Sequence, residues 1–167
     1  MKNSLQQKLF KKYPLIFMDR FKSGSITRMC DGITCRDGWY NLIDDACSQI
    51  ELIGKQFKVV VTFFQVKEKF AALRIYIGRI GYSPKLSGKQ IIIIGRLIHS
   101  ILHYTMCHSH NVCEECGEEG SKKRQLHDYL YNRCDECWKK LLQEIATENK
   151  EYKQKLKRQK LCQQLKK

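Results

Sequence analysis

Four cysteines in two Cys-x-x-Cys pairs constrain the fold of this chain more than any other feature of its sequence. The pairs are Cys113-x2-Cys116 and Cys134-x2-Cys137, and seventeen residues separate them. A Cys-x-x-Cys turn places two thiolates on one edge of a tetrahedron, and a second pair beyond a loop of about 15 to 20 residues supplies the other edge. The spacing therefore predicts a zinc ribbon over residues 111–138, with one structural Zn²⁺ bound by Cys113, Cys116, Cys134 and Cys137.

The same cysteines could instead be buried thiols or form two disulfides. Their neighbours are mostly glutamate, aspartate, glycine and asparagine, which are typical of a protein surface and argue against buried thiols. Disulfides are less compatible with an odd total of nine cysteines and with the absence of an apolar segment after the polar, basic residues 1–10. We therefore expect a reducing, cytoplasmic environment.

Apolar periodicity predicts the other elements. Hydrophobic residues make up 43% of the 167 positions, which suits one compact domain with a small appendage. β-branched and aromatic residues at 58–66 and 73–77 predict an antiparallel hairpin with the polar link 67–69. Helical spacing predicts helices at 4–12, 39–53, 89–108 and 138–167, although residues 91–94 could instead form a strand.

Local signals set the expected ends of these elements. Asp37 is the expected N-cap of helix 39–53, and Gly54 is its expected stop. The glycines in 19–38 and 78–88 predict loops. The apolar stretch 91–106 is interrupted by polar residues, so we expect it to be too short and too polar to span a membrane.

Together these elements predict an α+β fold. A small antiparallel hairpin or sheet packs on helices, and a zinc ribbon with four cysteine ligands and a basic C-terminal helix complete it. Residues 1–110 form the α+β core with its basic N-terminal helix, 111–138 form the zinc ribbon, and 139–167 form the basic C-terminal helix.

The net charge of +14 is concentrated at the ends of the chain. Residues 1–30 carry +6 and residues 139–167 carry +7, whereas the predicted ribbon carries −3. Four thiolates on one Zn²⁺ add about two negative charges to the ribbon. A phosphate backbone would therefore be attracted to the two ends and repelled by most of the ribbon.

Three groups of basic side chains are candidate contacts for nucleic acid or for an acidic partner surface. They are Lys67, Lys69 and Arg74 at the hairpin tip, Lys122, Lys123 and Arg124 in the ribbon, and Lys150, Lys153, Lys155, Lys157, Arg158 and Lys160 in the C-terminal helix. The hairpin tip is equally consistent with an ordinary exposed turn. The C-terminal helix could instead be a solvated helix that keeps the protein soluble, but its ten basic and three acidic residues favour a binding role.

An HNH-type nuclease is a minor alternative, because many such enzymes are built around paired Cys-x-x-Cys turns. His127, Asp128 and Asn132 are the residue types needed for a general base, a metal ligand and an orienting amide. The seventeen residues between the pairs leave little room for the ββα unit, and the Asp-His order is reversed. No other catalytic motif is present, so we expect a protein that is not an enzyme.

Other cysteines and histidines leave a second metal site open. His108 and His110 precede the first pair, and Cys30 and Cys35 have a loose Cys-x4-Cys spacing. Cys47 lies on the apolar face of a predicted helix, so we expect it to pack in the core. His99 and His103 lack the glutamate of a metalloprotease motif and are expected to be solvated or core side chains.

Three segments of the chain form a recognisable combination. They are Cys35-Arg36-Asp37-Gly38-Trp39-Tyr40 with Leu42, Ile43 and Cys47, then Gln65-Val66-Lys67-Glu68-Lys69-Phe70 leading to Leu73-Arg74-Ile75-Tyr76, and Cys113-Glu114-Glu115-Cys116-Gly117 with Cys134-Asp135-Glu136-Cys137. Together they resemble a family of small zinc-knuckle proteins of bacteriophages and prophages. The resemblance covers roughly residues 30–140 and leaves out both basic ends. The family typically has glycine where this chain has Ala71. The resemblance implies a mobile-element origin and a zinc knuckle, and it brings no catalytic residues.

These observations predict a non-enzymatic zinc-binding protein of phage type that binds a host protein or nucleoprotein complex in the bacterial cytoplasm. Inhibition of a bacterial defence system such as a CRISPR nuclease is the expected role. The alternative is a DNA- or RNA-binding accessory protein that uses its basic termini. In that case the affinity for nucleic acid would fall steeply with salt, and substitution of Lys153, Lys157 and Arg158 by glutamate would abolish binding. We expect no membrane contact, and the sequence leaves the oligomeric state open.

Overall fold

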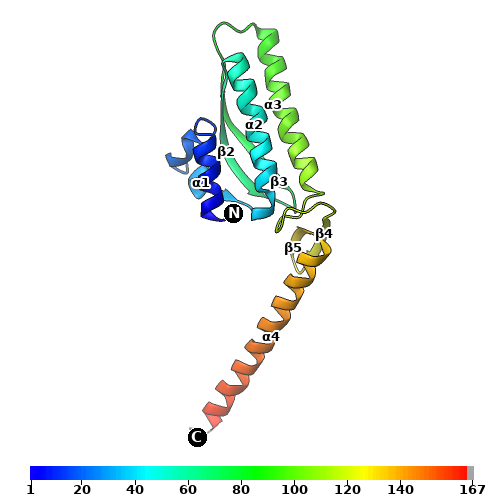
Figure 1. Ribbon diagram of the computed structural model, residues 1–167. Coiled ribbons are helices and arrows are strands. Elements are labelled where there is room, and N and C mark those ends of the chain that lie inside the picture. The colour runs from blue at the N-terminus through cyan, green and yellow to red at the C-terminus, as the bar shows by residue number, and fades with distance from the viewer. Residues whose placement is uncertain (165–167) are drawn as a thin grey trace. The chain divides into compact units, whose positions relative to one another are not determined.

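The computed structural model describes the backbone of residues 1–164 and the side chains up to residue 154, except that of Lys153 (Figure 1). It contains two compact units, Met1–Cys134 and the segment that begins at Asp135. The fold is α+β, as predicted, and combines helices with a three-stranded sheet and a two-stranded ribbon.

The three-stranded sheet has the order β1-β2-β3, with β1 at Ile33–Thr34, β2 at Val60–Glu68 and β3 at Leu73–Gly81. Strands β2 and β3 form the predicted antiparallel hairpin. Strand β1 is parallel to β2, and Ile33 pairs with Val66. Because β1 has only two residues, it gives no alternation that the sequence could reveal.

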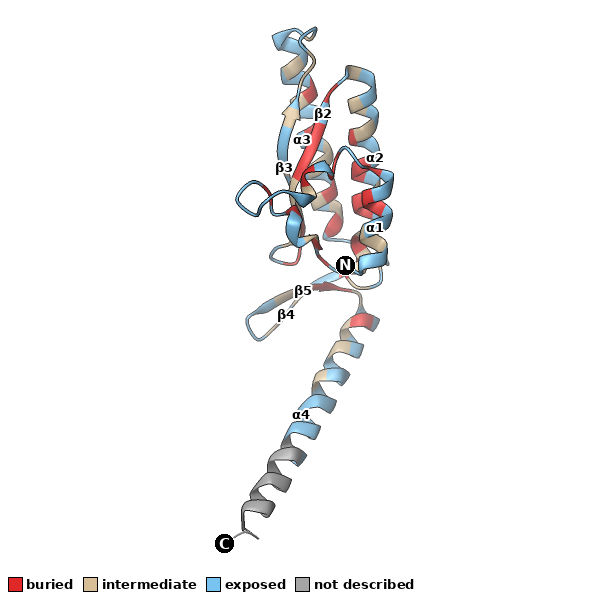
Figure 2. Cartoon of the chain, turned by 90° about the vertical axis from the view of Figure 1, so that its left-hand side faces the viewer, coloured by how far each residue is buried: buried red, intermediate tan, exposed pale blue. Residues whose placement is uncertain are grey.

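Helices α2 (Tyr40–Phe57) and α3 (Gly88–Ser109) lie side by side over one face of this sheet (Figure 1). Their apolar stripes meet the inward side chains of β2, so the buried residues lie between helices and sheet (Figure 2). The largest side chains in the core are Trp39, Tyr13, Phe17, Phe63, Leu9, Met29, Ile33, Ile43, Ile50, Leu73, Ile94 and Ile98.

The N-terminal segment covers the outer side of β2. Helix α1 (Asn3–Lys12) buries Leu9 and Phe10 and ends two residues before Pro14. The backbone N–H of Phe63 then donates to the carbonyl of Ile16 at 3.0 Å. The predicted loop 19–38 contains three short helical turns, η1 (Met18–Phe21), η2 (Met29–Asp31) and η3 (Asp37–Trp39), as well as β1.

The predicted cap and the predicted stop of helix α2 were both wrong, although its start lies within one residue of the prediction. The helix begins at Tyr40, and Asp37 accepts a hydrogen bond from the backbone N–H of Lys2 (2.7 Å) instead of capping it. Gly54 lies inside the helix, which continues to Phe57. The stop is Lys58, whose N–H donates to the carbonyl of Gly54. Its left-handed backbone (φ 56°) lets the N–H of the next residue, Val59, donate to the same carbonyl at 3.0 Å.

The β2–β3 turn lies later in the chain than predicted. Lys67 and Glu68 belong to β2, and the turn is closed by reciprocal hydrogen bonds between Lys69 and Ala72. Phe70 (φ 56°) and Ala71 (φ 59°) are both left-handed, and the Glu68 carboxylate accepts a hydrogen bond from the Ala71 N–H at 2.6 Å. Ala71 therefore adopts a conformation that glycine adopts at lower cost. Strand β3 also includes residues 78–81, which were predicted as loop.

Helix α3 begins with a capping box, in which Ser87 and Gln90 each bind the other's backbone N–H. Residues 91–94 are helical, so the alternative of a strand there is wrong. Among the described helices, α3 alone is long and apolar enough to cross a membrane, judged by length and composition only. By these two criteria, the prediction that residues 91–106 are too short and too polar to span a membrane was wrong. Ile94 and Ile98 are nevertheless buried in the protein core.

The ribbon contains strands β4 (Lys122–Leu126) and β5 (Tyr129–Arg133), paired antiparallel from Lys122↔Arg133 to Leu126↔Tyr129. His127 has a left-handed backbone (φ 52°) at the turn between them. Helix α4 (Asp135–Gln164) is separated from β5 by Cys134 alone and begins three residues before the predicted start.

Candidate metal centre

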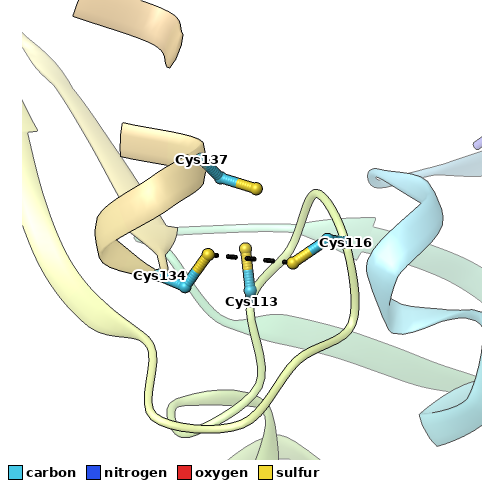
Figure 3. Close-up of side chains that lie close together, drawn as sticks. All are labelled: Cys113, Cys116, Cys134 and Cys137. Atoms are coloured by element: carbon cyan, nitrogen blue, oxygen red, sulfur yellow. Dashed lines mark hydrogen bonds between the residues drawn. The ribbon is translucent and has the colours of Figure 1, made fainter. Parts of the chain in front are cut away.

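The four cysteines of the two Cys-x-x-Cys pairs lie together (Figure 3). Their sulfur atoms are all within 4.8 Å of one another, and the sulfurs of Cys116 and Cys134 are 3.8 Å apart. An ion bound about 2.3 Å from four tetrahedral sulfurs places those sulfurs roughly 3.8 Å apart, whereas a disulfide requires about 2.05 Å. The sulfurs of Cys116 and Cys134 are therefore too far apart for a disulfide bond, and the cluster can hold a metal ion.

Each pair is presented by a different kind of local structure. Cys113 and Cys116 stand in the loop after α3, where the N–H of Gly117 donates to the carbonyl of Cys113 at 2.9 Å and Gly117 has φ 85°. Cys134 follows the last residue of β5, and Cys137 lies in the first turn of α4. Glycine adopts the left-handed conformation found at Gly117 without steric cost, so the chain can turn directly after Cys116.

The segment Cys35–Trp39 fastens the first pair to the core. The N–H of Gly38 donates to the carbonyl of Glu114 at 2.9 Å, and the indole N–H of Trp39 donates to the carbonyl of Val112 at 2.9 Å. A Cβ on Gly38 would lie 2.6 Å from the backbone nitrogen of Gly117 and closer still to the carbonyl of Cys113. Only glycine fits at this position.

Backbone hydrogen bonds favour the thiolate form of Cys113. Burial raises the pKa of this thiol, but the backbone N–H groups of Cys116, Cys134 and Glu115 act on its sulfur in the opposite direction. The net pKa lies below its ordinary value. A thiolate is the form that binds a metal, so this geometry prepares Cys113 as a ligand.

A network of two acids and two arginines lies beside the first pair. Glu114 is buried, with Arg133 at 3.3 Å and Arg36 at 3.6 Å from its carboxylate. Burial raises the pKa of Glu114, and Arg133 opposes that rise. Glu115 pairs with the same two arginines, at 2.8 and 2.9 Å. The two arginines therefore neutralise part of the negative charge of the ribbon. The prediction that Glu114 lies at the surface was wrong.

The residues proposed for an HNH-type nuclease are not assembled into a site. The Asn132 amide is buried and donates to the carbonyls of Ser109 (2.6 Å) and Val112 (2.9 Å), where it joins β5 to the end of α3. His127 and Asp128 are exposed in the β4–β5 turn, five and four residues before Asn132 in the chain.

The other cysteines and histidines form no comparable cluster. Within the described residues, the tetrad is the sole group of three or more His, Cys, Asp or Glu side chains placed to hold a metal. Cys30 is exposed, and Cys35 is buried. His108 lies 3.8 Å from the carboxylate of Glu119, and His110 is exposed.

Cys47 on α2 and two histidines on α3 lie outside any such cluster of the described residues. Cys47 is fully buried in the core, as predicted. His99 and His103 are both exposed to solvent, which was one of the two predicted environments.

The structure places the basic candidates at separate points. Lys67 and Arg74 pair across the β2–β3 hairpin; the Lys67 ammonium lies over the ring of Tyr76, and the guanidinium of Arg74 contacts the sulfur of Met106. Lys69 is exposed in the turn.

In the ribbon, Lys122, Lys123 and Arg124 lie on β4, and Arg124 donates to the carbonyl of Arg133 at 3.4 Å. Lys150 is exposed on α4. The side chains of Lys153, Lys155, Lys157, Arg158 and Lys160 lie outside the described ones.

The tips of the two hairpins enclose a groove, which we call the two-hairpin groove. It consists of two adjoining surface cavities of about 420 and 450 Å³ that share Glu68, Tyr129 and Leu130. The remaining lining residues are Lys69, Phe70, Gln125, Asp128, Thr34, Cys35, Arg36, Glu114 and Tyr131. Phe70 and Tyr129 border the groove with 62% and 70% of their surface exposed.

The sequence did not reveal this groove, because it joins residues about sixty positions apart in the chain. A weak signal was present: Phe70 and Tyr129 are aromatic residues that each follow a charged residue, Lys69 and Asp128, in a polar segment of the sequence. No family model, curated protein or solved structure matches this chain.

Proposed function

We propose that this chain is a non-catalytic zinc-binding protein that binds a host protein or nucleoprotein complex through the two-hairpin groove. The observation that carries the proposal is the pair of exposed aromatic rings, Phe70 and Tyr129, at the edges of a groove beside the metal centre. Aromatic and arginine side chains are enriched where proteins bind one another, and the central ones contribute most of the affinity. Arg36 also lines this groove.

Zinc is the metal that best suits four cysteine sulfurs at this spacing, and its role here is structural. Structural zinc sites use four protein ligands, whereas catalytic sites leave one position open. With four cysteines in place, the ion fixes the loop that leads into β4 and the end of β5. The metal thereby holds the wall of the groove that carries Tyr129.

The target class follows from the resemblance to zinc-knuckle proteins of bacteriophages. A small phage protein without an active site acts by occupying a partner, and a bacterial defence complex such as a CRISPR nuclease is the target we propose. Such nucleoproteins offer both acidic protein surface and guide phosphates to the basic residues of this chain, in the host cytoplasm.

The test is affinity capture from bacterial lysate with the wild-type chain and with the double variant Phe70→Ala, Tyr129→Ala. Tyr104→Ala is the matched control, because Tyr104 is equally exposed but lies on α3, outside the groove. We expect one protein to be captured by the wild type and the control, with or without nuclease treatment, and to be lost by the double variant. Equal capture by all three chains would contradict the proposal.

A second candidate is binding of single-stranded nucleic acid, which one observation favours. Lys67 lies 5.5 Å from the ring centre of Tyr76 and Lys69 lies 5.2 Å from that of Phe70, so cations accompany exposed rings. Aromatic rings that stack on bases, with lysines on phosphates, are the usual means of binding single strands. Two results would favour this function over the first. Capture would disappear after nuclease treatment, and the affinity for oligonucleotides would fall steeply with salt.

A further inference from the structure

A second cavity lies in the α+β core, outside the two-hairpin groove. Its volume is about 310 Å³, and it opens between the end of α2, the start of β2 and the segment after α1. The lining residues are Tyr13, Leu15, Ile16, Ile50, Glu51, Gly54, Lys55, Lys58, Val59, Val60 and Val61. Its size is at the lower end of the roughly 300–1,000 Å³ that small-ligand sites occupy.

Most of the residues that line this cavity are apolar. Its inner walls are formed by four residues of the buried core, Ile16, Ile50, Val59 and Val61. Leu15 also lines the cavity, yet 58% of its surface is exposed. An isolated exposed leucine is ordinary, but an exposed leucine that continues a buried apolar wall marks the mouth of a site for an apolar group.

The charge at the mouth is positive. Lys55 is paired with Glu51 at 2.7 Å, so these two charges neutralise each other. Lys58 is exposed, lines the same cavity and takes part in no ion pair within the described residues. The left-handed backbone of Lys58 ends helix α2 at this residue. The Lys58 ammonium is therefore an uncompensated positive charge beside the apolar mouth of the cavity.

We propose that this cavity binds an anionic amphiphile, with the hydrocarbon part inside and the anionic head beside Lys58. A cavity of about 310 Å³ accommodates a body of roughly eight to ten carbons. The ligand class is a medium-chain carboxylate or the anionic lipid of a membrane surface, which share an apolar body and a negative head. This site is independent of the two-hairpin groove.

The experiment titrates sodium decanoate into the full zinc-loaded chain and follows the methyl NMR signals of the valines and isoleucines. We expect saturable shifts at Ile50, Val59 and Val61, with octanoate binding about fifteen-fold more weakly because each methylene contributes about fourfold. We expect decanol to bind about threefold to fivefold more weakly than decanoate, because it lacks the charge that an exposed lysine recognises.

Two variants and two controls test the assignment. Lys58→Glu should weaken decanoate binding about tenfold and leave decanol unchanged, whereas Lys89→Glu on α3 should change neither. Leu15→Ser combined with Val60→Thr should weaken both ligands at least tenfold, whereas Leu52→Ser should not, because Leu52 is exposed on α2 but lies outside the cavity.

Sedimentation with phosphatidylglycerol vesicles separates the two sources of ligand. Vesicle binding that Lys58→Glu abolishes would identify a membrane lipid, and decanoate binding without vesicle binding would identify a free carboxylate; either result supports the proposal. Three results would overturn it: no saturable shift with decanoate, shifts spread equally over the exposed Ile92 and Ile93, or binding that the Lys58 and Leu15/Val60 variants leave unchanged.

Discussion

Gly38 and Trp39 show how single residues away from the cysteines position the metal centre. The sequence marked Gly38 as a loop residue and Trp39 as the start of a helix, and neither was linked to the cysteines some 75 positions later. In the structure, Gly38 lies against the backbone of the first Cys-x-x-Cys turn, and Trp39 bonds the residue before Cys113. Both contacts are made to backbone atoms of the Cys-x-x-Cys segment, which leave no pattern of residue types, so the sequence could not reveal them.

Gly38→Ala is expected to destabilise the protein by about 1–3 kcal/mol, because the added methyl must displace backbone atoms that have no room to move. Urea unfolding of the metal-loaded chain measures the change. Gly88→Ala is the matched control, since nothing lies within 4 Å of a Cβ there and the position is the first of α3. Equal stability of the two variants would contradict the role assigned to Gly38.

Cysteine reactivity provides a second test at this scale. Burial raises the pKa of Cys35 to about 12, so at pH 8 roughly one molecule in ten thousand carries the Cys35 thiolate. Burial also raises the pKa of Cys47, whereas Cys30 and Cys107 are exposed. In the folded chain, iodoacetamide should label Cys30 and Cys107 long before Cys35 and Cys47, as read by peptide mass spectrometry.

Because only the thiolate reacts, labelling of Cys35 should speed up as the pH rises from 8 toward 12. In urea, all four of these cysteines should react at similar rates. Rapid labelling of Cys35 in the folded chain at pH 8 would contradict its burial.

At the scale of elements, periodicity identified the main helices and the β2–β3 hairpin, but it failed at several of their ends. Helix α2 passes Gly54 and stops at Lys58, and the β2–β3 turn uses Phe70 and Ala71 in place of residues 67–69. Non-glycine residues with left-handed backbones occupy both places. Tertiary packing of α2 on the sheet, and the Glu68 carboxylate on the Ala71 N–H, outweigh the local preference for glycine.

Lys58→Gly should stabilise the protein by about 1 kcal/mol, since glycine adopts the left-handed conformation after a helix without the cost that a side chain imposes. The matched variant Lys55→Gly, three residues earlier inside the helix, should destabilise it by about 1 kcal/mol. Thermal unfolding of the two variants separates the effects. A loss of stability in Lys58→Gly would mean that the α2 end is held differently.

Removal of the metal should affect the ribbon before the core. Residues 111–138 have few buried apolar side chains of their own, so a chelator is expected to unfold them first and to leave α2 and β2 protected. Hydrogen exchange with and without the chelator measures this order. Loss of protection in α2 at the same rate as in the ribbon would show that the core depends on the metal directly.

For the whole molecule, the sequence identified the four metal-ligating cysteines but did not locate the recognition surface that we propose. The four ligands follow from local spacing, whereas the two-hairpin groove forms only when distant turns meet. Charge was also misleading: Lys2 and Lys12 of the basic N-terminus pair with Asp37 and Asp44, and the ribbon acids Glu114 and Glu115 are compensated by Arg36. Net charge by segment does not include such pairing between segments.

Four cysteine sulfurs that hold one zinc ion as a scaffold are the basis of both the fold of the ribbon and its proposed role. X-ray absorption at the zinc edge of the purified chain measures the ligands of this ion. We expect one zinc per chain with four sulfur ligands at about 2.3 Å and no oxygen or nitrogen neighbour. A folded chain that contains no zinc, or a zinc ion with fewer than four sulfur ligands, would contradict it.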